Sequence, residues 1–215
     1  MNTTKKFDFN TISDFDIHID KSIPNYSFLI SAVKSISDYF VTENGVIYDI
    51  GCSTGKLLKS LPYNCKKVGY DNSNLLPESE NENLIFQNKD VTKEVALDNA
   101  QIVYSIFTLQ FIEPIERINL LQNIYDSLNE GGIFILCEKV YQNDGKLQEI
   151  LTFSHYDYKS QHFTLNEIFS KEKDLRFIMK PKTLEDNLQD LKRVGFKTST
   201  TFFQSFNFVG IIALK

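Results

Sequence analysis

A glycine-rich turn between an apolar strand and a helix constrains the fold of this chain more than any other feature. The run 46–50, VIYDI, is apolar and β-branched and predicts a buried strand. It leads into the turn GCSTG (51–55) and then into KLLKSL (56–61), which has a helical pattern. In α/β proteins such a turn brings backbone N–H groups and the positive end of a helix against a ligand. The run therefore predicts a ligand-binding turn on a parallel sheet.

An acidic residue follows the next predicted strand. The short apolar run 68–70 ends in Asp71, which lies 20 residues after Gly51. A carboxylate at this spacing can accept hydrogen bonds from both hydroxyl groups of a ribose. Strand, glycine turn, helix, strand and acid together indicate a cofactor that contains a nucleoside.

The same glycines are compatible with two other interpretations. The turn also matches G-x-S-x-G, which would make Ser53 the nucleophile of a hydrolase, with His155 or His162 as its base. A hydrolase of that class needs strands and an oxyanion loop before the nucleophile, and no such segments precede Ser53. The other alternative is a turn that needs glycine only for its backbone conformation, but the position of Asp71 argues against it.

Length and composition are those of an ordinary globular protein. The chain has 215 residues, of which 42% are apolar and 24% are charged. We therefore expect a single domain over 1–215 with a full hydrophobic core. Within it we expect an N-terminal arm and helix at 1–45 and a polar, aromatic insertion at 141–180.

Charge and hydropathy patterns disfavour two classes of partner. The net charge is −5 and the 23 basic residues are scattered, so we expect no direct contact with nucleic acid. No apolar run approaches the roughly 18 residues of a membrane span, and the N-terminus lacks a signal-peptide core. The three cysteines have no metal-site spacing, so we expect no metal, reduced thiols and a cytoplasmic location.

The remaining apolar runs continue the alternation of strands and helices. Further strands are expected at 84–86, 101–107 and 133–137. Helices are expected from Ser27, Pro114 and Thr183, the second with a buried stripe of Ile115, Ile118, Leu121, Ile124 and Leu128. The last two strands, near 197–204 and 207–214, are too close for an intervening helix and must form an antiparallel hairpin.

This α/β layout is that of class I methyltransferases that use S-adenosylmethionine (SAM): a seven-stranded, Rossmann-like sheet with a terminal antiparallel hairpin. Right-handed crossovers from a central first strand place the strand ends along one edge. The glycine turn, Asp71, Asp90 and the end of the fourth strand are therefore expected to meet at one ligand.

Beyond the general fold, the chain resembles the carboxy-SAM synthases, which act in the modification of tRNA wobble uridine. The matching segments are SIPNYS (22–27), VIYDIGCSTG (46–55), YDNS (70–73), FTLQFIEPIER (107–117), NEGG (129–132), EK (138–139) and FQSFNF (203–208). The F-T-L-Q-F and Q-x-F-N-F runs are far more specific than the glycine turn. The resemblance implies a homodimer in which the insertion helix crosses to the partner.

The resemblance also implies a set of cofactor-binding residues. These are Tyr26 at the methionine end, Gly51, Cys52 and Ser53 at the carboxylate and ribose, Asp71 and Asn72 at the ribose and adenine, Asp90 and Val91 at the adenine amine, and Ile106 at the end of the fourth strand.

The chain departs from the family pattern at two positions. Ile106 replaces an Asn, and Glu172 falls where the family has an Arg that pairs with the additional carboxylate of carboxy-SAM. A Glu repels a carboxylate, so we expect the protein to bind SAM at least as tightly as carboxy-SAM. Lys173, one position further, could restore the positive charge.

Three functions follow as hypotheses. The first is the family reaction, in which prephenate supplies a carboxyl group that is captured at the SAM methyl group. The second is another SAM-dependent reaction, either methyl transfer to a small molecule or a displacement within SAM that releases methylthioadenosine. The third is a SAM-binding protein without catalysis. The short chain favours a small-molecule substrate, or SAM itself, over a macromolecule.

Candidate acid and base groups lie in the insertion and at the end of the fifth strand. His155, Tyr156, Tyr158 and His162 belong to the insertion. An imidazole can move a proton at physiological pH, although surface polar residues are the commoner case. The pair 138–139, Glu-Lys, is either catalytic by position or an ion pair that closes the edge of the sheet.

Overall fold

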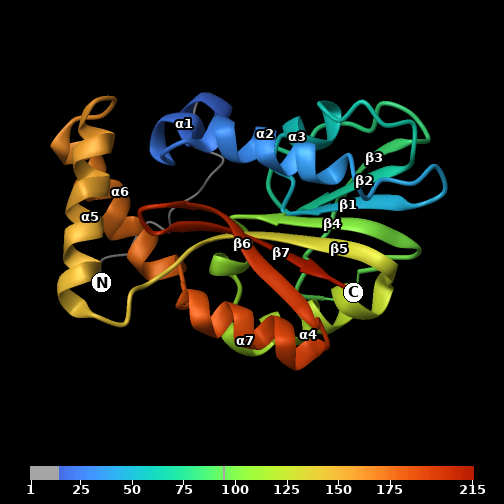
Figure 1. Ribbon diagram of the computed structural model, residues 1–215. Coiled ribbons are helices and arrows are strands. Elements are labelled where there is room, and N and C mark those ends of the chain that lie inside the picture. The colour runs from blue at the N-terminus through green and yellow to red at the C-terminus, as the bar shows by residue number, and fades with distance from the viewer. Residues whose placement is uncertain (1–14, 94) are drawn as a thin grey trace.

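The computed structural model describes residues 15–93 and 95–215, whose strands form one seven-stranded sheet (Figure 1). The strands are β1 (Val46–Ile50), β2 (Lys67–Asp71), β3 (Leu84–Asn88), β4 (Ala100–Ile106), β5 (Leu128–Lys139), β6 (Thr198–Ser205) and β7 (Phe208–Leu214). Their order across the sheet is β3-β2-β1-β4-β5-β7-β6. Strand β7 pairs antiparallel with β5 and β6, whereas the pairs among β1–β5 are parallel. The expected sheet and its terminal hairpin are confirmed.

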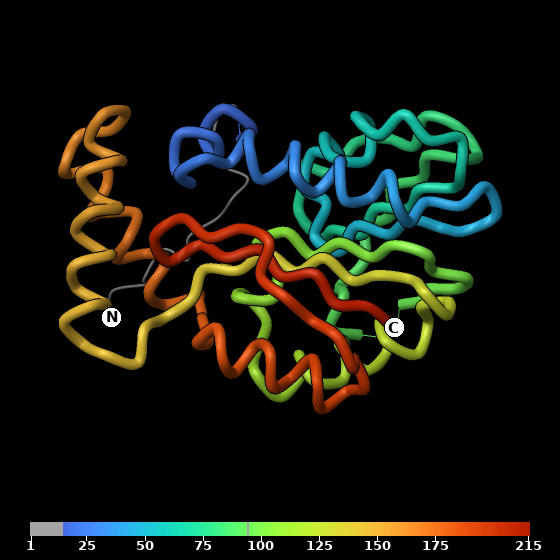
Figure 2. Tube along the Cα trace, viewed as in Figure 1, coloured from blue at the N-terminus to red at the C-terminus, as the bar shows by residue number. Residues whose placement is uncertain are grey.

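Helices cover both faces of the sheet (Figure 2). On one face α2 (Tyr26–Ser37) and α3 (Lys56–Lys59) pack on the strands, with Leu29 and Val33 fully buried. On the other face α4 (Pro114–Ser127) and α7 (Leu184–Val194) bury Leu121, Ile124 and Leu191. Because helices cover both faces of the sheet, both sides of β1 and β4 are buried, which explains why their sequences are almost continuously apolar.

Three further helices and a short turn complete the described part of the chain. Helix α1 (Phe15–Ser22) precedes α2, the 3-10 turn η2 (Leu109–Phe111) follows β4, and α5 (Gly145–Ser160) and α6 (Leu165–Ile178) form the insertion. The side chain of Asp144 caps α5, and Thr164 with Glu167 forms a capping box at α6. In Figures 1 and 2 α5 and α6 stand together at one end of the sheet.

The predicted stripe of α4 was wrong at one position. Leu121, Ile124 and Leu128 are buried as expected, but Ile115 is 78% exposed. Arg117 takes the corresponding place on the buried side and is only 2% exposed. A long side chain can bury its apolar stem in this way while its charged end finds hydrogen bonds, so a search for apolar residues alone misplaces the first turn.

Among the helices within 15–93 and 95–215, none has the length and apolar character that crossing a membrane requires.

Candidate active site

A cavity of about 390 Å³ lies where β1, β2, β4 and β5 end, and α1, α5 and α6 also line it. All ten residues predicted to line a ligand site border this cavity: Tyr26, Gly51, Cys52, Ser53, Asp71, Asn72, Asp90, Val91, Ile106 and Glu172. They come from six separate segments of the chain. The strand ends therefore bring them together, as the connections of a parallel sheet predict.

The backbone conformation of the glycine turn requires a glycine at position 51. Gly51 has φ of +80°, and a Cβ atom there would lie 2.1 Å from Oγ1 of Thr108, so only glycine fits. The backbone N–H groups of Gly51 and Cys52 both donate to the carbonyl of Tyr70. Ser53 also has positive φ, 48°, and borders the cavity.

Asp71 is fixed by the backbone around it. Its Oδ2 accepts a hydrogen bond from the N–H of Ser53 at 2.8 Å, and its Oδ1 accepts one from the N–H of Ser73 at 2.7 Å. A carboxylate has about four acceptor positions, so each oxygen retains a lone pair for a ligand. The two backbone contacts orient the carboxylate before any ligand is bound.

Asp90 is organised by its neighbours in sequence. Its Oδ1 accepts from both the N–H and the hydroxyl group of Thr92, and Lys93 lies 3.4 Å from its Oδ2. The Thr92 hydroxyl contributes most to a pKa of Asp90 below its ordinary value. The residue therefore remains a charged acceptor at the edge of the cavity.

Asp49 is a cavity residue that the sequence analysis missed. It lies at the end of β1, is 3% exposed, and its Oδ1 makes no hydrogen bond within the described residues. Burial, with a smaller contribution from the negative charge of Asp71, raises the pKa of Asp49 to about 7. A single acid within an apolar strand, just before a glycine turn, was the signal that could have identified it.

Other buried polar atoms without partners point to the same cavity. Within the described residues the hydroxyl groups of Ser22 and Ser53 make no hydrogen bond, and both residues border it. Buried polar groups are nearly always satisfied, so orphaned atoms around one cavity indicate a polar ligand. With Asp49, they fit a ligand that carries hydroxyl, amino and carboxylate groups.

Aromatic rings form one wall of the cavity. Phe107 lies between Tyr26, with ring centroids 6.5 Å apart, and Phe208, with centroids 5.7 Å apart. His155 packs edge-on against Phe208 at 5.0 Å. Phe107 and Phe208 come from the two most specific sequence runs, F-T-L-Q-F and Q-x-F-N-F. Such a wall attracts a cation such as a sulfonium through the ring faces.

Glu172 lies between two lysines in the interior. Its Oε2 is 3.6 Å from Nζ of Lys139, and its Oε1 is 3.4 Å from Nζ of Lys159. Burial opposes ionisation of Glu172, but the two lysines hold its pKa below its ordinary value. Lys173, which was expected to restore the charge, is exposed and does not border the cavity.

A third lysine borders the cavity beside this group. Burial, followed by repulsion from Lys159, lowers the pKa of Lys171 to about 8. Its ammonium contacts Nε2 of His18 on α1. Burial and the adjacent Lys171 lower the pKa of His18 to about 4, so the imidazole is neutral and accepts. The lysines near Glu172 therefore outnumber the glutamate, and this part of the cavity is positively charged.

Of the predicted acid and base candidates in the insertion, only His155 borders the cavity; Tyr156, Tyr158 and His162 do not. Nε2 of His155 is 2.9 Å from the carbonyl of Ser22, and since a carbonyl only accepts, this nitrogen carries the proton. Burial lowers the pKa of His155 to about 4. The ring is therefore neutral at physiological pH, with Nδ1 as an acceptor.

Glu138 and Lys139, at the end of β5, lie in two different environments. Lys139 borders the cavity, where it pairs with Glu172. Glu138 is fully buried and lies outside the cavity lining, and burial raises its pKa to about 8 although the positive charge of Arg117 opposes this. The two residues therefore do not form the ion pair that was one of the expectations.

The hydrolase interpretation of the glycine turn finds no support in the geometry. Within the described residues the Ser53 hydroxyl group has no hydrogen-bond partner, and His155 is bonded to a backbone carbonyl. A nucleophilic serine needs a base within hydrogen-bond reach.

Sequences of several named proteins are similar to this chain over almost its whole length. It is 38% identical to the carboxy-S-adenosyl-L-methionine synthase of Staphylococcus epidermidis over 95% of the chain and 94% of that protein. It is 34% identical to the enzyme of the same name from Shewanella halifaxensis, over 98% and 92%. The chain belongs to the carboxy-SAM synthase family. Carboxy-SAM synthases are SAM-dependent transferases, and SAM is the cofactor of this member also.

Solved structures agree on the fold. Human N-acetylserotonin methyltransferase in complex with SAM matches with a TM-score of 0.55 at 18% identity, over 87% of the chain and 55% of that protein. A SAM-dependent methyltransferase from Mesorhizobium loti matches with a TM-score of 0.56 at 14% identity, over 84% and 96%. No protein-family model matches the chain. At these identities the structures show a class I SAM-methyltransferase fold and nothing finer.

Proposed function

We propose that this carboxy-SAM synthase family member converts SAM into carboxy-SAM, with prephenate as the carboxyl donor. The observation that carries the proposal is the positive charge of Lys139, Lys159 and Lys171 inside a cavity whose other residues suit SAM. Methyl transfer alone places no additional carboxylate beside the sulfonium. A product with a carboxylate on the transferred carbon needs a cation there.

The arrangement supports a specific orientation of SAM. We propose that Asp71 and Asn72 bind the ribose and the adenine, and that Asp90 and Val91 bind the adenine amine. At the other end Asp49 is a partner for the α-ammonium group, and the open turn formed by Gly51, Cys52 and Ser53 lies between the two. Tyr26 and the aromatic wall then face the sulfonium, with Ile106 beside them.

The neighbours of Glu172 favour a different effect from the one expected from the sequence. A lone buried glutamate would repel a second carboxylate, but here Lys139 and Lys159 neutralise it. Lys171 adds a further positive charge on the same side. We therefore propose that the three lysines take over the role of the family arginine, and that carboxy-SAM binds more tightly than SAM.

The residues of the chain have separate roles in the proposed reaction. The sulfonium of SAM would acidify its methyl group, so that one C–H bond breaks and the carbon forms a bond to the CO2 that prephenate releases. The ring of prephenate aromatises with loss of hydroxide, which leaves with the methyl proton as water. The aromatic wall holds the sulfonium in a site shielded from water. The lysines hold the carboxylate, and His155 offers a neutral Nδ1 acceptor beside Phe208.

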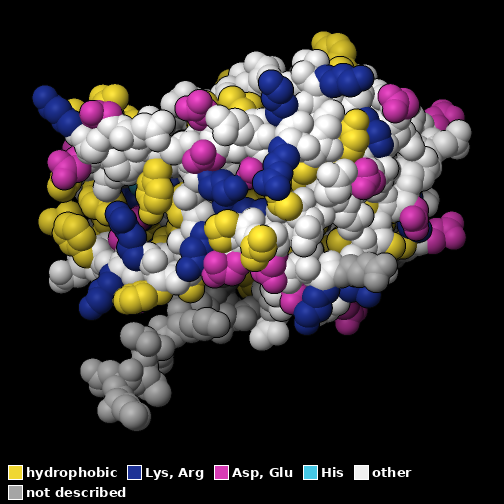
Figure 3. Space-filling model, turned by 90° about the horizontal axis from the view of Figure 1, so that it is seen from below, with side chains coloured by type: hydrophobic (Ala, Val, Ile, Leu, Met, Phe, Trp, Pro, Cys, Tyr) yellow, Lys and Arg dark blue, Asp and Glu magenta, His cyan; other side chains and the backbone are white. Residues whose placement is uncertain are grey.

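An apolar surface supports a homodimer. Six large apolar side chains on α5 and α6 are between 48% and 64% exposed: Leu147, Ile150, Phe153, Leu165, Phe169 and Phe177. Figure 3 shows hydrophobic side chains gathered at the end of the molecule where these helices lie. Large contiguous apolar patches are uncommon on monomers. We propose that a second copy of the chain covers this patch.

Mass spectrometry of the nucleoside that is released from the purified protein tests the proposed function. We expect carboxy-SAM in the released fraction, because the cavity offers cations for its carboxylate. SAM or methylthioadenosine without any carboxy-SAM would instead favour another SAM-dependent reaction.

A further inference from the structure

We propose that Gln110 determines ligand specificity: its side-chain N–H groups, together with the Lys139 ammonium, bind the carboxylate on the transferred carbon of carboxy-SAM. The inference rests on the proposed function and assigns a residue to it. Gln110 belongs to the F-T-L-Q-F run, lies in η2 directly after β4, and borders the cavity although it is only 5% exposed.

One hydrogen bond fixes which end of the Gln110 amide is available. The backbone N–H of Lys139 donates to Oε1 of Gln110 at 2.8 Å. Because an N–H group needs an acceptor, this contact assigns the oxygen, and Nε2 must be the other end of the amide. Nε2 donates no hydrogen bond to any residue in the described ranges. Two N–H donors on a buried side chain are therefore left for a ligand.

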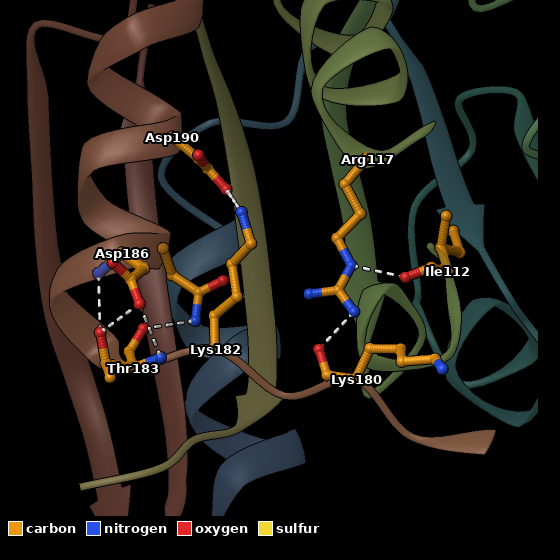
Figure 4. A network of polar contacts seen from close by, with 8 residues as sticks. Ile112, Arg117, Lys180, Lys182, Thr183, Asp186 and Asp190 are labelled. Carbon is orange, nitrogen blue, oxygen red and sulfur yellow. Dashed lines mark hydrogen bonds and ion pairs between the residues drawn. The ribbon is translucent and has the colours of Figure 1, made fainter. Parts of the chain in front are cut away.

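The turn that carries Gln110 is held rigidly from outside the cavity. The backbone N–H of Lys180 donates to the carbonyl of Gln110 at 2.7 Å. As Figure 4 shows, the guanidinium of Arg117 bridges the carbonyl of Ile112, 2.8 Å from Nε, and the carbonyl of Lys180. Arg117 thereby joins the two segments that meet at Gln110, so the amide is positioned before a ligand arrives.

The surroundings of Gln110 match an anion. Lys139, whose backbone N–H binds the Gln110 oxygen, borders the same cavity, with its ammonium 5.8 Å from the centroid of the Phe208 ring. This ammonium is also 3.6 Å from Oε2 of Glu172, a carboxylate that Lys159 neutralises as well. An amide donor and an ammonium that border one cavity can together bind a carboxylate through charge-assisted hydrogen bonds. The sulfonium methyl group of SAM offers these donors no acceptor, so they favour the carboxylated ligand.

The test is a competition titration of SAM and carboxy-SAM against wild type and Gln110→Glu. Glutamate retains an oxygen for the N–H of Lys139, so the turn keeps its contact, but it replaces the donor with a negative charge. We expect the preference for carboxy-SAM over SAM to fall about tenfold or more. Gln204→Glu, the same change on an exposed residue of β6, is the matched control and should retain the preference.

The outcomes separate this inference from the proposed function. A Gln110→Glu protein that keeps the wild-type preference overturns the role of Gln110 and leaves the proposed function standing. A wild type that has no preference for carboxy-SAM overturns both. If Gln110→Glu does not fold, as judged by its thermal melt, Gln110→Met lacks the donor without adding charge; its preference must fall, and an unchanged preference would again refute the assignment.

Discussion

Asp49 shows how one buried acid can link the stability of this protein to the binding of its ligand. In the ligand-free protein the carboxyl is 3% exposed and titrates near pH 7 because burial disfavours its charge. A cation next to it, such as the ammonium group of SAM, favours the charged form. Ionised Asp49 therefore lowers the stability of the folded protein in the absence of ligand, but it favours the binding of a ligand that carries an ammonium group.

The first prediction concerns Asp49→Asn. A carboxyl whose folded pKa is raised binds more protons in the folded than in the unfolded state, so stability is lost as pH rises from about 4 to about 7. Ligand-free Asp49→Asn should therefore be more stable than wild type at pH 8, by up to about 4 kcal/mol, and the gain should disappear near pH 4. Urea unfolding at the two pH values measures this.

The same variant should alter the pH dependence of SAM binding. Wild-type affinity should rise about tenfold between pH 6 and pH 8, because the ammonium needs ionised Asp49. Asp49→Asn should bind more weakly and without this slope. Calorimetry at several pH values decides the matter, and an equal slope in both proteins would remove Asp49 from the binding site.

A second prediction at this scale concerns Asp71. Loss of its charge-assisted contacts to the ribose should cost about 1.5–3 kcal/mol, or some tenfold to hundredfold in SAM affinity. Asp71→Ala should show this loss in calorimetry, and Asp71→Asn, which retains one acceptor oxygen, should lose less. Asp98→Ala serves as the control because Asp98 is exposed and lies outside the cavity lining. Equal SAM affinity in all three variants would contradict the ribose assignment.

At the scale of secondary-structure elements, α5 and α6 serve two surfaces at once. One side of the pair supplies His155, Lys159 and Glu172 to the cavity, and the other exposes the apolar patch. Dimerisation across the patch would therefore stabilise the helices that carry the cationic residues. If the proposed dimer forms, it would therefore support the cavity from the opposite side of these helices.

The prediction for these helices is that Phe153→Glu yields a monomer. Phe153 is 61% exposed on α5, and burying a new charge in a dimer interface is unfavourable. Ile115→Glu is the matched control, because Ile115 is 78% exposed but lies on α4 rather than on α5 or α6. Light scattering at micromolar concentrations should find wild type and Ile115→Glu dimeric. A monomeric wild type, or a dimeric Phe153→Glu, would rule out this interface.

For the molecule as a whole, the sequence allowed the sheet and half of the cavity to be predicted. Strands, glycine turn and Asp71 follow local patterns, in which neighbouring residues specify both the element and its end. The run of F-T-L-Q-F marked the turn after β4, although no local pattern distinguished Gln110 as the residue with free donors.

The cationic half of the cavity could not be predicted in the same way. Lys139, Lys159 and Lys171 lie on β5, α5 and α6, and each alone is an ordinary lysine in the sequence. Lys171 precedes Glu172 in the sequence, but only the packing of the insertion against the strand ends brings Lys139 and Lys159 to it. The match with the family pattern therefore predicted that Glu172 repels the carboxylate of carboxy-SAM. In the structure, positively charged lysines lie around Glu172.

The most direct test of the central claim is a turnover assay with the purified protein, SAM and prephenate, with the products identified by mass spectrometry. A cavity that combines the SAM site with the lysines should yield carboxy-SAM, and omission of prephenate should abolish its formation. The simultaneous variant Lys159→Met with Lys171→Met should lose most of this product. Formation of methylthioadenosine or S-adenosylhomocysteine without carboxy-SAM, in the presence of prephenate, would contradict the account.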